Sequence, residues 1–274
     1  MPNRFTLSPR SRLRTRPRIA RRCSLFGLKI ENATIQEAAD TLIAAARTGI
    51  RRRVYFVNAH CVNVAAKDSD YSRVLEQADL LYADGSGMAV AARLAGTPLR
   101  DNVNGTDLFP ALCERAVTSG VPLALLGAKP GIAQRCAENM VAKYPGLQIV
   151  WHHDGYFTPA EVPELIASLN ASGAKILLVA RGVPLQETWI AKHAPHIDIP
   201  VVLGVGALFD FYSGAIPRSP TWMRKAGFEW LFRLALEPKR LFGRYVLGNP
   251  IFLARLFMRW ARGGYALRKR RLSP

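Results

Sequence analysis

Short, continuously apolar segments alternate with stretches of helical periodicity through most of this 274-residue chain. Four such segments are residues 54–57, 123–126, 176–180 and 201–205. Each is too short for a buried helix and lacks the polar alternation of a strand with one solvent-exposed face. Strands that are buried on both faces and separated by helices form a mainly parallel sheet. The pattern therefore predicts an α/β, Rossmann-like fold with helices covering both faces of the sheet.

The N-terminal part of the pattern begins with a single expected strand at residues 25–30. Asn32 and Thr34 then provide side chains suited to a helix N-cap. Apolar residues at helical spacing follow until Gly49, where a helix is expected to end. A further strand is expected at residues 78–82, shortly before Asp84.

The net charge of +18 is concentrated at the two ends of the chain. Residues 1–22 contain eight arginines, no acidic residue and no apolar core of a secretory signal. Residues 218–274 contain fourteen basic residues and two glutamates, whereas residues 23–217 are close to neutral. This distribution predicts a basic, disordered arm over 1–22, an α/β catalytic domain over 23–217 and a basic appendage over 218–274.

The composition of the appendage favours an anionic membrane surface over nucleic acid, although cationic segments attract both. Between residues 228 and 260, bulky apolar residues are interspersed with basic ones, as in an amphipathic helix that lies in the lipid headgroup region. No uninterrupted apolar run reaches about 18 residues, so a membrane-spanning helix is not expected. The alternative is a helical hairpin packed on the core with solvated arginines.

Glycine and polar residues gather where the expected strands end. In such sheets ligands bind at the carboxyl ends of the strands, where helix N-termini present free N–H groups. Four loops have this composition: residues 58–60, 84–87, 127–131 and 181–187. Together they predict a diphosphate-binding cradle, although single turns between strands and helices also use glycine. Neither G-x-G-x-x-G nor G-x-x-x-x-G-K-[ST] occurs, which argues against standard dinucleotide and P-loop enzymes.

Asp84 is the expected catalytic residue. A carboxylate directly after a buried strand, followed by Gly85 and Gly87, is expected to point into the ligand crevice. Partial desolvation there raises the pKa of a carboxyl group towards values that suit a general base. The structural alternative is that Asp84 caps the helix that starts near Met88. His60, at the end of another strand, is a further candidate acid or base.

The order of several short motifs resembles the WecG/TagA/CpsF family, glycosyltransferase family 26. The resemblance covers roughly residues 25–250. The matching stretches are the Asn58 turn, Ala83–Gly87, Arg100, Asn104–Leu108, Leu126–Gly131, Gly155–Phe157, Gly182–Glu187, Gly204–Asp210, Gly227–Trp230 and Glu237–Arg240.

The resemblance implies an inverting transfer of a sugar from a UDP-sugar to a polyprenyl-diphosphate-linked saccharide acceptor. The sugar would be of the N-acetylmannosamine type or glucose, and the product would enter cell-surface polysaccharide synthesis. The family acts peripherally at the cytoplasmic face of the bacterial inner membrane. The carboxylate that deprotonates the acceptor hydroxyl in the family corresponds to Asp84 here.

The resemblance also implies which residues form the site. Asn58, Arg100 and Gln186 match active-site positions of the family. The other substrate-binding candidates lie at or near the strand ends and are His60, Asn104, Gly127, Lys129, Arg181 and Gly206. The arginines expected at the membrane and the diphosphate are Arg218, Arg233, Arg240 and Arg244.

No cofactor beyond the UDP-sugar is expected. Arginines or helix N-termini can stabilise a departing diphosphate without a metal ion. Asp68 and Asp70 have the spacing of a metal-binding pair but lie in a polar stretch away from the strand ends.

The competing functions are a nucleic-acid-binding α/β protein without catalysis and a nucleotide-binding module without turnover. A homo-oligomer is compatible with the sequence, and Asp210 is expected to be structural.

Overall fold

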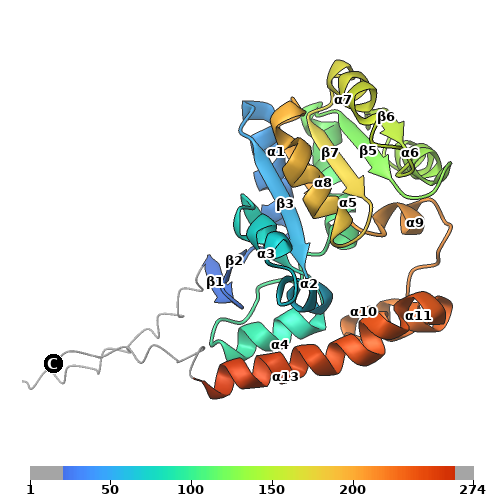
Figure 1. Ribbon diagram of the computed structural model, residues 1–274. Coiled ribbons are helices and arrows are strands. Elements are labelled where there is room, and N and C mark those ends of the chain that lie inside the picture. Colours follow the sequence, from blue (N-terminus) through green and yellow to red (C-terminus); the bar gives the residue numbers. More distant parts are fainter. Residues whose placement is uncertain (1–20, 263–274) are drawn as a thin grey trace, which may run out of the picture.

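The computed structural model describes residues 21–262, which form an eight-stranded sheet with helices on both faces (Figure 1). The strands are β1 (Arg22–Leu25), β2 (Leu28–Glu31), β3 (Arg52–Val57), β4 (Leu80–Ala83), β5 (Leu123–Gly127), β6 (Ile149–His153), β7 (Ile176–Ala180) and β8 (Val201–Gly204). Their order is β1-β2-β4-β3-β8-β7-β5-β6, and every neighbouring pair is parallel except β1 and β2. The predicted mainly parallel sheet is confirmed.

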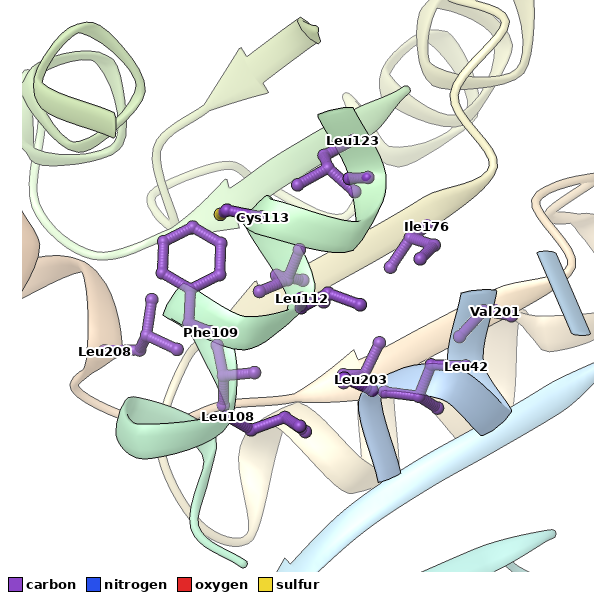
Figure 2. Close-up of a cluster of buried hydrophobic side chains, with 14 of the residues drawn as sticks. Leu42, Leu108, Phe109, Leu112, Cys113, Leu123, Ile176, Val201, Leu203 and Leu208 are labelled. Carbon is purple, nitrogen blue, oxygen red and sulfur yellow. The ribbon is translucent and has the colours of Figure 1, made fainter. Parts of the chain in front are cut away.

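Alternate residues of the central strands face two separate apolar cores. Val54 and Phe56 of β3 face one core, and Tyr55 and Val57 face the other. The first core is covered by α1 (Ile35–Thr48), α5 (Gly105–Ser119), α6 (Ile132–Lys143) and α9 (Leu208–Tyr212). Figure 2 shows how Leu108 and Leu112 of α5 pack among the side chains of the strands. The second core is covered by α2 (Ala59–Ala65), α3 (Ser69–Glu76), α4 (Ser86–Leu94), α7 (Val162–Ala171), α8 (Leu185–His193) and α13 (Gly248–Ala261).

The single strand expected at residues 25–30 is wrong, because the chain forms a hairpin there. Phe26 and Gly27 have φ angles of 54° and 88°, in the left-handed region that two-residue hairpin turns require. The turn pairs Leu25 with Leu28 and makes β1 antiparallel to β2. The N-cap and C-cap predicted for the next helix are confirmed, since Thr34 caps α1 and Gly49 ends it at φ 71°.

The appendage is a chain of short helices that lies under the carboxyl ends of the strands (Figure 1). It comprises α10 (Thr221–Lys225), α11 (Glu229–Leu236), α12 (Pro238–Phe242), the π-helical turn η2 (Gly243–Leu247) and α13. Phe252 and Leu256 of α13 are buried against the body of the protein, and the ring of Phe252 lies 5.3 Å from that of Phe26. Within residues 21–262 no helix is both long and apolar enough to cross a bilayer.

A further expectation concerns the N-terminal arm. Residues 1–20 of the predicted arm lie outside the described residues, and Arg22 already belongs to β1. The four cysteines are free and buried. The 3₁₀ turn η1 (Ala194–His196) follows α8.

Gly127 at the end of β5 is a position where only glycine fits. A Cβ there would lie 2.8 Å from the Cα of Ala180 and closer still to its carbonyl group, and the φ angle is 133°. We expect Gly127→Ala to lower the free energy of unfolding by about 3 kcal/mol or more, measured by chemical denaturation. Gly120→Ala is the matched control, because Gly120 has a φ of 60° but no atom within 4 Å of its Cβ position. Its loss should be about 1 kcal/mol, and equal losses would contradict the close approach of β5 and β7.

Candidate active site

A cleft of about 1350 Å³ opens between the carboxyl ends of the strands and the appendage. Loops that follow β3, β4, β5, β6, β7 and β8 form one side, and α11, α12 and η2 form the other. Most of the residues predicted for the site line it, namely Asn58, His60, Asp84, Asn104, Lys129, Arg181, Gln186, Gly206, Arg233, Arg240 and Arg244. The cleft therefore brings together motifs that lie far apart in the sequence.

Asp84 lies partly buried on the wall of this cleft, directly after β4. Its backbone N–H donates to the carbonyl of Val57 over 2.8 Å, which extends the pairing of β3 with β4 by one residue. Its carboxylate accepts a hydrogen bond of 3.1 Å from the side-chain amide of Asn58. Helix α4 begins at Ser86, and its N-cap is Gly85, which provides no side-chain bond. The capping alternative for Asp84 is wrong.

The environment of Asp84 favours the protonated form more than water does. Burial raises the pKa of its carboxyl group, while the Asn58 amide and the nearby charges of Arg244 and Arg233 oppose that shift. A carboxylate with a raised pKa and a cationic neighbourhood remains able to accept a proton. The same environment is suitable for a general base.

Asn58 links Asp84 to the helix that follows β3. Its side-chain oxygen accepts hydrogen bonds from the backbone N–H groups of His60 and Cys61, at 3.0 Å and 3.2 Å, and so caps α2. Its amide nitrogen is left to donate to Asp84. The cap on α2 thus fixes the Asn58 side chain through its oxygen, and its nitrogen in turn fixes the carboxylate of Asp84.

His60 lies on the cleft wall, within the electrostatic influence of Arg244. Burial, and secondarily the charge of Arg244, lowers the pKa of its imidazole to about 4. The ring is therefore neutral at pH 7 and offers one donor and one acceptor, but no positive charge.

Three arginines of the appendage face the strand-end loops across the cleft. Arg233 comes from α11, Arg240 from α12 and Arg244 from η2. The guanidinium of Arg233 stacks over the ring of Phe211 at 5.3 Å and lies 4.0 Å from the carboxylate of Glu237, with which Arg240 also pairs. Among the described residues Arg244 has no ion-pair partner. The cleft thus contains cationic groups that are available to an anionic ligand.

Three predicted residues do not line the cleft. Arg100 instead donates to Glu37 of α1 over 2.8 Å. Arg218 pairs with Asp107. The carboxylate of Asp107 also accepts a hydrogen bond of 2.6 Å from the side-chain amide of Asn104. The third is Gly127, which brings β5 close to β7 beneath the cleft.

The cleft also contains residues that the sequence analysis did not assign to the site. Tyr156, Asp210 and Glu229 all line it. Burial raises the pKa of both carboxyl groups. The Gly-Tyr-Phe stretch follows the end of β6, so the strand-end pattern that predicted the other loops also applies to Tyr156. Glu229 lies in the stretch Gly227–Trp230 that resembles the family, but it reaches the cleft from helix α11 and follows no strand. Asp210, expected to be structural, lies on the cleft wall.

The side chains of Asp68 and Asp70 lie outside the cleft and interact with residues close to them in sequence. Asp68 caps α3 by accepting bonds from the N–H groups of Asp70 and Tyr71, and Asp70 pairs with Arg73. In the part of the chain that the structure describes, no three His, Cys, Asp or Glu side chains gather as a metal site.

Glu187 is fully buried under the cleft, and burial raises its pKa to about 7. The folded protein therefore loses stability as the pH rises from the unfolded pKa of the group, near 4.5, through 7. We expect Glu187→Gln to remove this dependence. The difference in unfolding free energy between variant and wild type should grow by about 2 kcal/mol from pH 5 to pH 8. Glu164→Gln, at an exposed position of α7, is the control, and parallel pH profiles for all three proteins would contradict the burial of an ionisable Glu187.

Comparison with known families agrees with this geometry. Residues 23–265 of the chain match the family described as "Glycosyl transferase WecG/TagA/CpsF family". The match extends from β1 to just past the end of α13 and so includes both sides of the cleft. The resemblance noted from short motifs is confirmed over this whole range. The chain therefore belongs to the WecG/TagA/CpsF family of glycosyltransferases, which act in cell-surface polysaccharide synthesis.

Proposed function

We propose that the protein transfers a sugar from a UDP-sugar to a polyprenyl-diphosphate-linked saccharide, with inversion at the anomeric carbon. The donor sugar is of the N-acetylmannosamine type or glucose. The observation that carries the proposal is the carboxylate of Asp84, held by Asn58 on a cleft wall that faces the arginines of the appendage. Membership in a glycosyltransferase family favours this enzyme over the nucleic-acid-binding alternative.

Asp84 acts as the general base in this proposal. Its carboxylate takes the proton of an acceptor hydroxyl while the hydroxyl oxygen attacks the anomeric carbon of the donor sugar. The bond between that carbon and the β-phosphate oxygen breaks, and UDP leaves with the bonding electrons. A single displacement of this kind inverts the configuration. The hydrogen bond from Asn58 fixes the carboxylate for the transfer.

The leaving diphosphate is stabilised by the cations opposite Asp84. Arg233 and Arg244 are close enough to Asp84 for their charges to affect its pKa, so negative charge that develops beside Asp84 also lies near them. Charge-assisted hydrogen bonds from guanidinium groups stabilise a diphosphate. The proposal requires no metal ion for this step.

The outer face of the appendage binds the membrane in this proposal. Phe257 and Trp260 of α13 are 63% and 50% exposed, and their rings lie 5.8 Å apart. Arg259 and Arg262 are exposed at the end of the same helix. Exposed aromatic side chains next to arginines suit the headgroup region of an anionic bilayer. The protein would then act peripherally at the cytoplasmic face of the inner membrane, where a polyprenyl-linked acceptor resides.

Asp84→Asn tests the base directly. The asparagine keeps an oxygen that accepts from Asn58, so the variant should fold and bind UDP with unchanged affinity. The kcat for sugar transfer should fall by about 10²- to 10⁴-fold, because the substituted amide cannot take a proton. Transfer would be measured with UDP-sugars and a short-chain polyprenyl-diphosphate saccharide. Asp198→Asn, at an exposed surface position with a side chain 77% exposed, is the control; wild-type turnover by Asp84→Asn would remove Asp84 from the mechanism.

The membrane assignment is tested by Phe257→Ser combined with Trp260→Ser. We expect this pair to weaken binding to vesicles containing phosphatidylglycerol by about tenfold or more, measured by sedimentation, because two aromatic contacts with the bilayer are lost. The matched control is Val141→Ser with Val150→Ser, two exposed apolar residues outside the appendage. Equal vesicle binding by wild type and the aromatic variant would refute the docking of α13.

A further inference from the structure

The side chain of Gln186 ties together two loops of the cleft. Its oxygen accepts hydrogen bonds from the backbone N–H of Gly206 at 2.8 Å and of Gly182 at 3.2 Å. Gly182 follows β7 and Gly206 follows β8, so one amide oxygen joins the ends of two adjacent strands. The side chain lies against Gly204, where a Cβ would approach it to 3.1 Å. Gln186 is only 3% exposed, although it lines the cleft.

The next residue, Glu187, supports this side chain from below. Its carboxylate accepts a hydrogen bond of 2.7 Å from the amide nitrogen of Gln186. Glu187 is 0% exposed, and the buried side chains of Tyr55, Cys61 and Tyr71 lie close to it. Within residues 21–262 it has no ion-pair partner. In this part of the chain the buried carboxylate is thus held by a hydrogen bond from the Gln186 amide and not by a cation.

The two sets of bonds allow only one orientation of the Gln186 amide. Two backbone N–H groups on one side need an acceptor, and the Glu187 carboxylate on the other side needs a donor. A flipped amide would set its NH₂ group against both N–H groups and its oxygen against the carboxylate. Glu187 therefore selects the orientation in which Gln186 joins the loops.

We infer that Glu187 is a positioning residue for the donor site, which acts through the Gln186 amide to fix the loops that carry Arg181 and Gly206. Both of these residues line the cleft, and the Arg181 guanidinium stacks over Phe157 at 4.4 Å. The inference rests on the proposed function, because it assigns these loops to the UDP-sugar. Loops that separate by even a small distance would no longer present their groups to one ligand.

A reciprocal exchange of the two side chains tests the inference. Gln186→Glu places two carboxylates together and removes the donor to Glu187. It should lower the affinity for UDP and the kcat/KM for the donor by about 10- to 100-fold. Adding Glu187→Gln supplies a donor amide, while the carboxylate introduced at position 186 still accepts from both glycines. This double variant, the exchanged pair, should recover most of the UDP affinity and kcat/KM that Gln186→Glu loses. Both the loss and the recovery should appear in KM and not in kcat.

Two single variants complete the experiment. Glu187→Gln keeps an oxygen that accepts from Gln186 and should retain activity within about threefold of wild type. Glu187→Leu has no acceptor and should resemble Gln186→Glu. Failure of the exchanged pair to improve on Gln186→Glu, or wild-type kcat/KM in Glu187→Leu, would overturn the inference. If Glu187→Leu does not fold, the exchanged pair decides alone.

A readout that needs no turnover separates this inference from the proposed function. In protein labelled with ¹⁵N-glycine, the amide resonances of Gly182 and Gly206 should shift in Gln186→Glu and return in the exchanged pair. Unchanged resonances would refute the positioning role of Glu187. A wild type that binds no UDP would refute the proposed function, and the glycine resonances would still report on Glu187.

Discussion

The hydrogen bond from Asn58 to Asp84 joins the ends of two adjacent parallel strands, and the cleft is organised around it. Because β3 and β4 run in the same direction, the residues that follow them emerge at the same edge of the sheet. Asn58 is immobilised by its cap on α2, so the carboxylate that it holds has a fixed place. The positions of the Asp84 carboxylate and of the N-terminus of α2 beside it therefore both follow from the parallel pairing of β3 with β4.

The appendage gives this edge its second wall. Buried residues on α13 anchor it to the second core, and helices α11 and α12 carry arginines over the strand ends. The same segment exposes aromatic residues on its outer side. One element thus connects the cleft, where a diphosphate would be held, with the surface on which a lipid-linked acceptor would arrive. The appendage combines features of the two alternatives, a membrane-surface helix and a hairpin packed on the core. It packs on the core and still exposes an apolar face.

Local patterns in the sequence predicted the parallel sheet and most of the cleft, because strand ends in such a sheet converge whatever the connecting helices contain. Long-range ion pairs, by contrast, leave no local pattern in the sequence. Arg100 is drawn to Glu37 and Arg218 to Asp107, and no spacing rule reveals either pair. The Phe26-Gly27 turn was missed because its apolar first residue resembles a strand interior. Glu187 was found only in three dimensions, since its role depends on an amide and on glycines from two loops.

The central claim is that the cleft beside Asp84 binds a nucleoside diphosphate. A crystal structure of the full chain with UDP tests this most directly. The account predicts a diphosphate between the strand-end loops and Arg233 or Arg244, at ion-pair distance, with open space between the β-phosphate and Asp84 for a sugar. UDP bound outside this cleft, or with its β-phosphate turned away from Asp84, would contradict it.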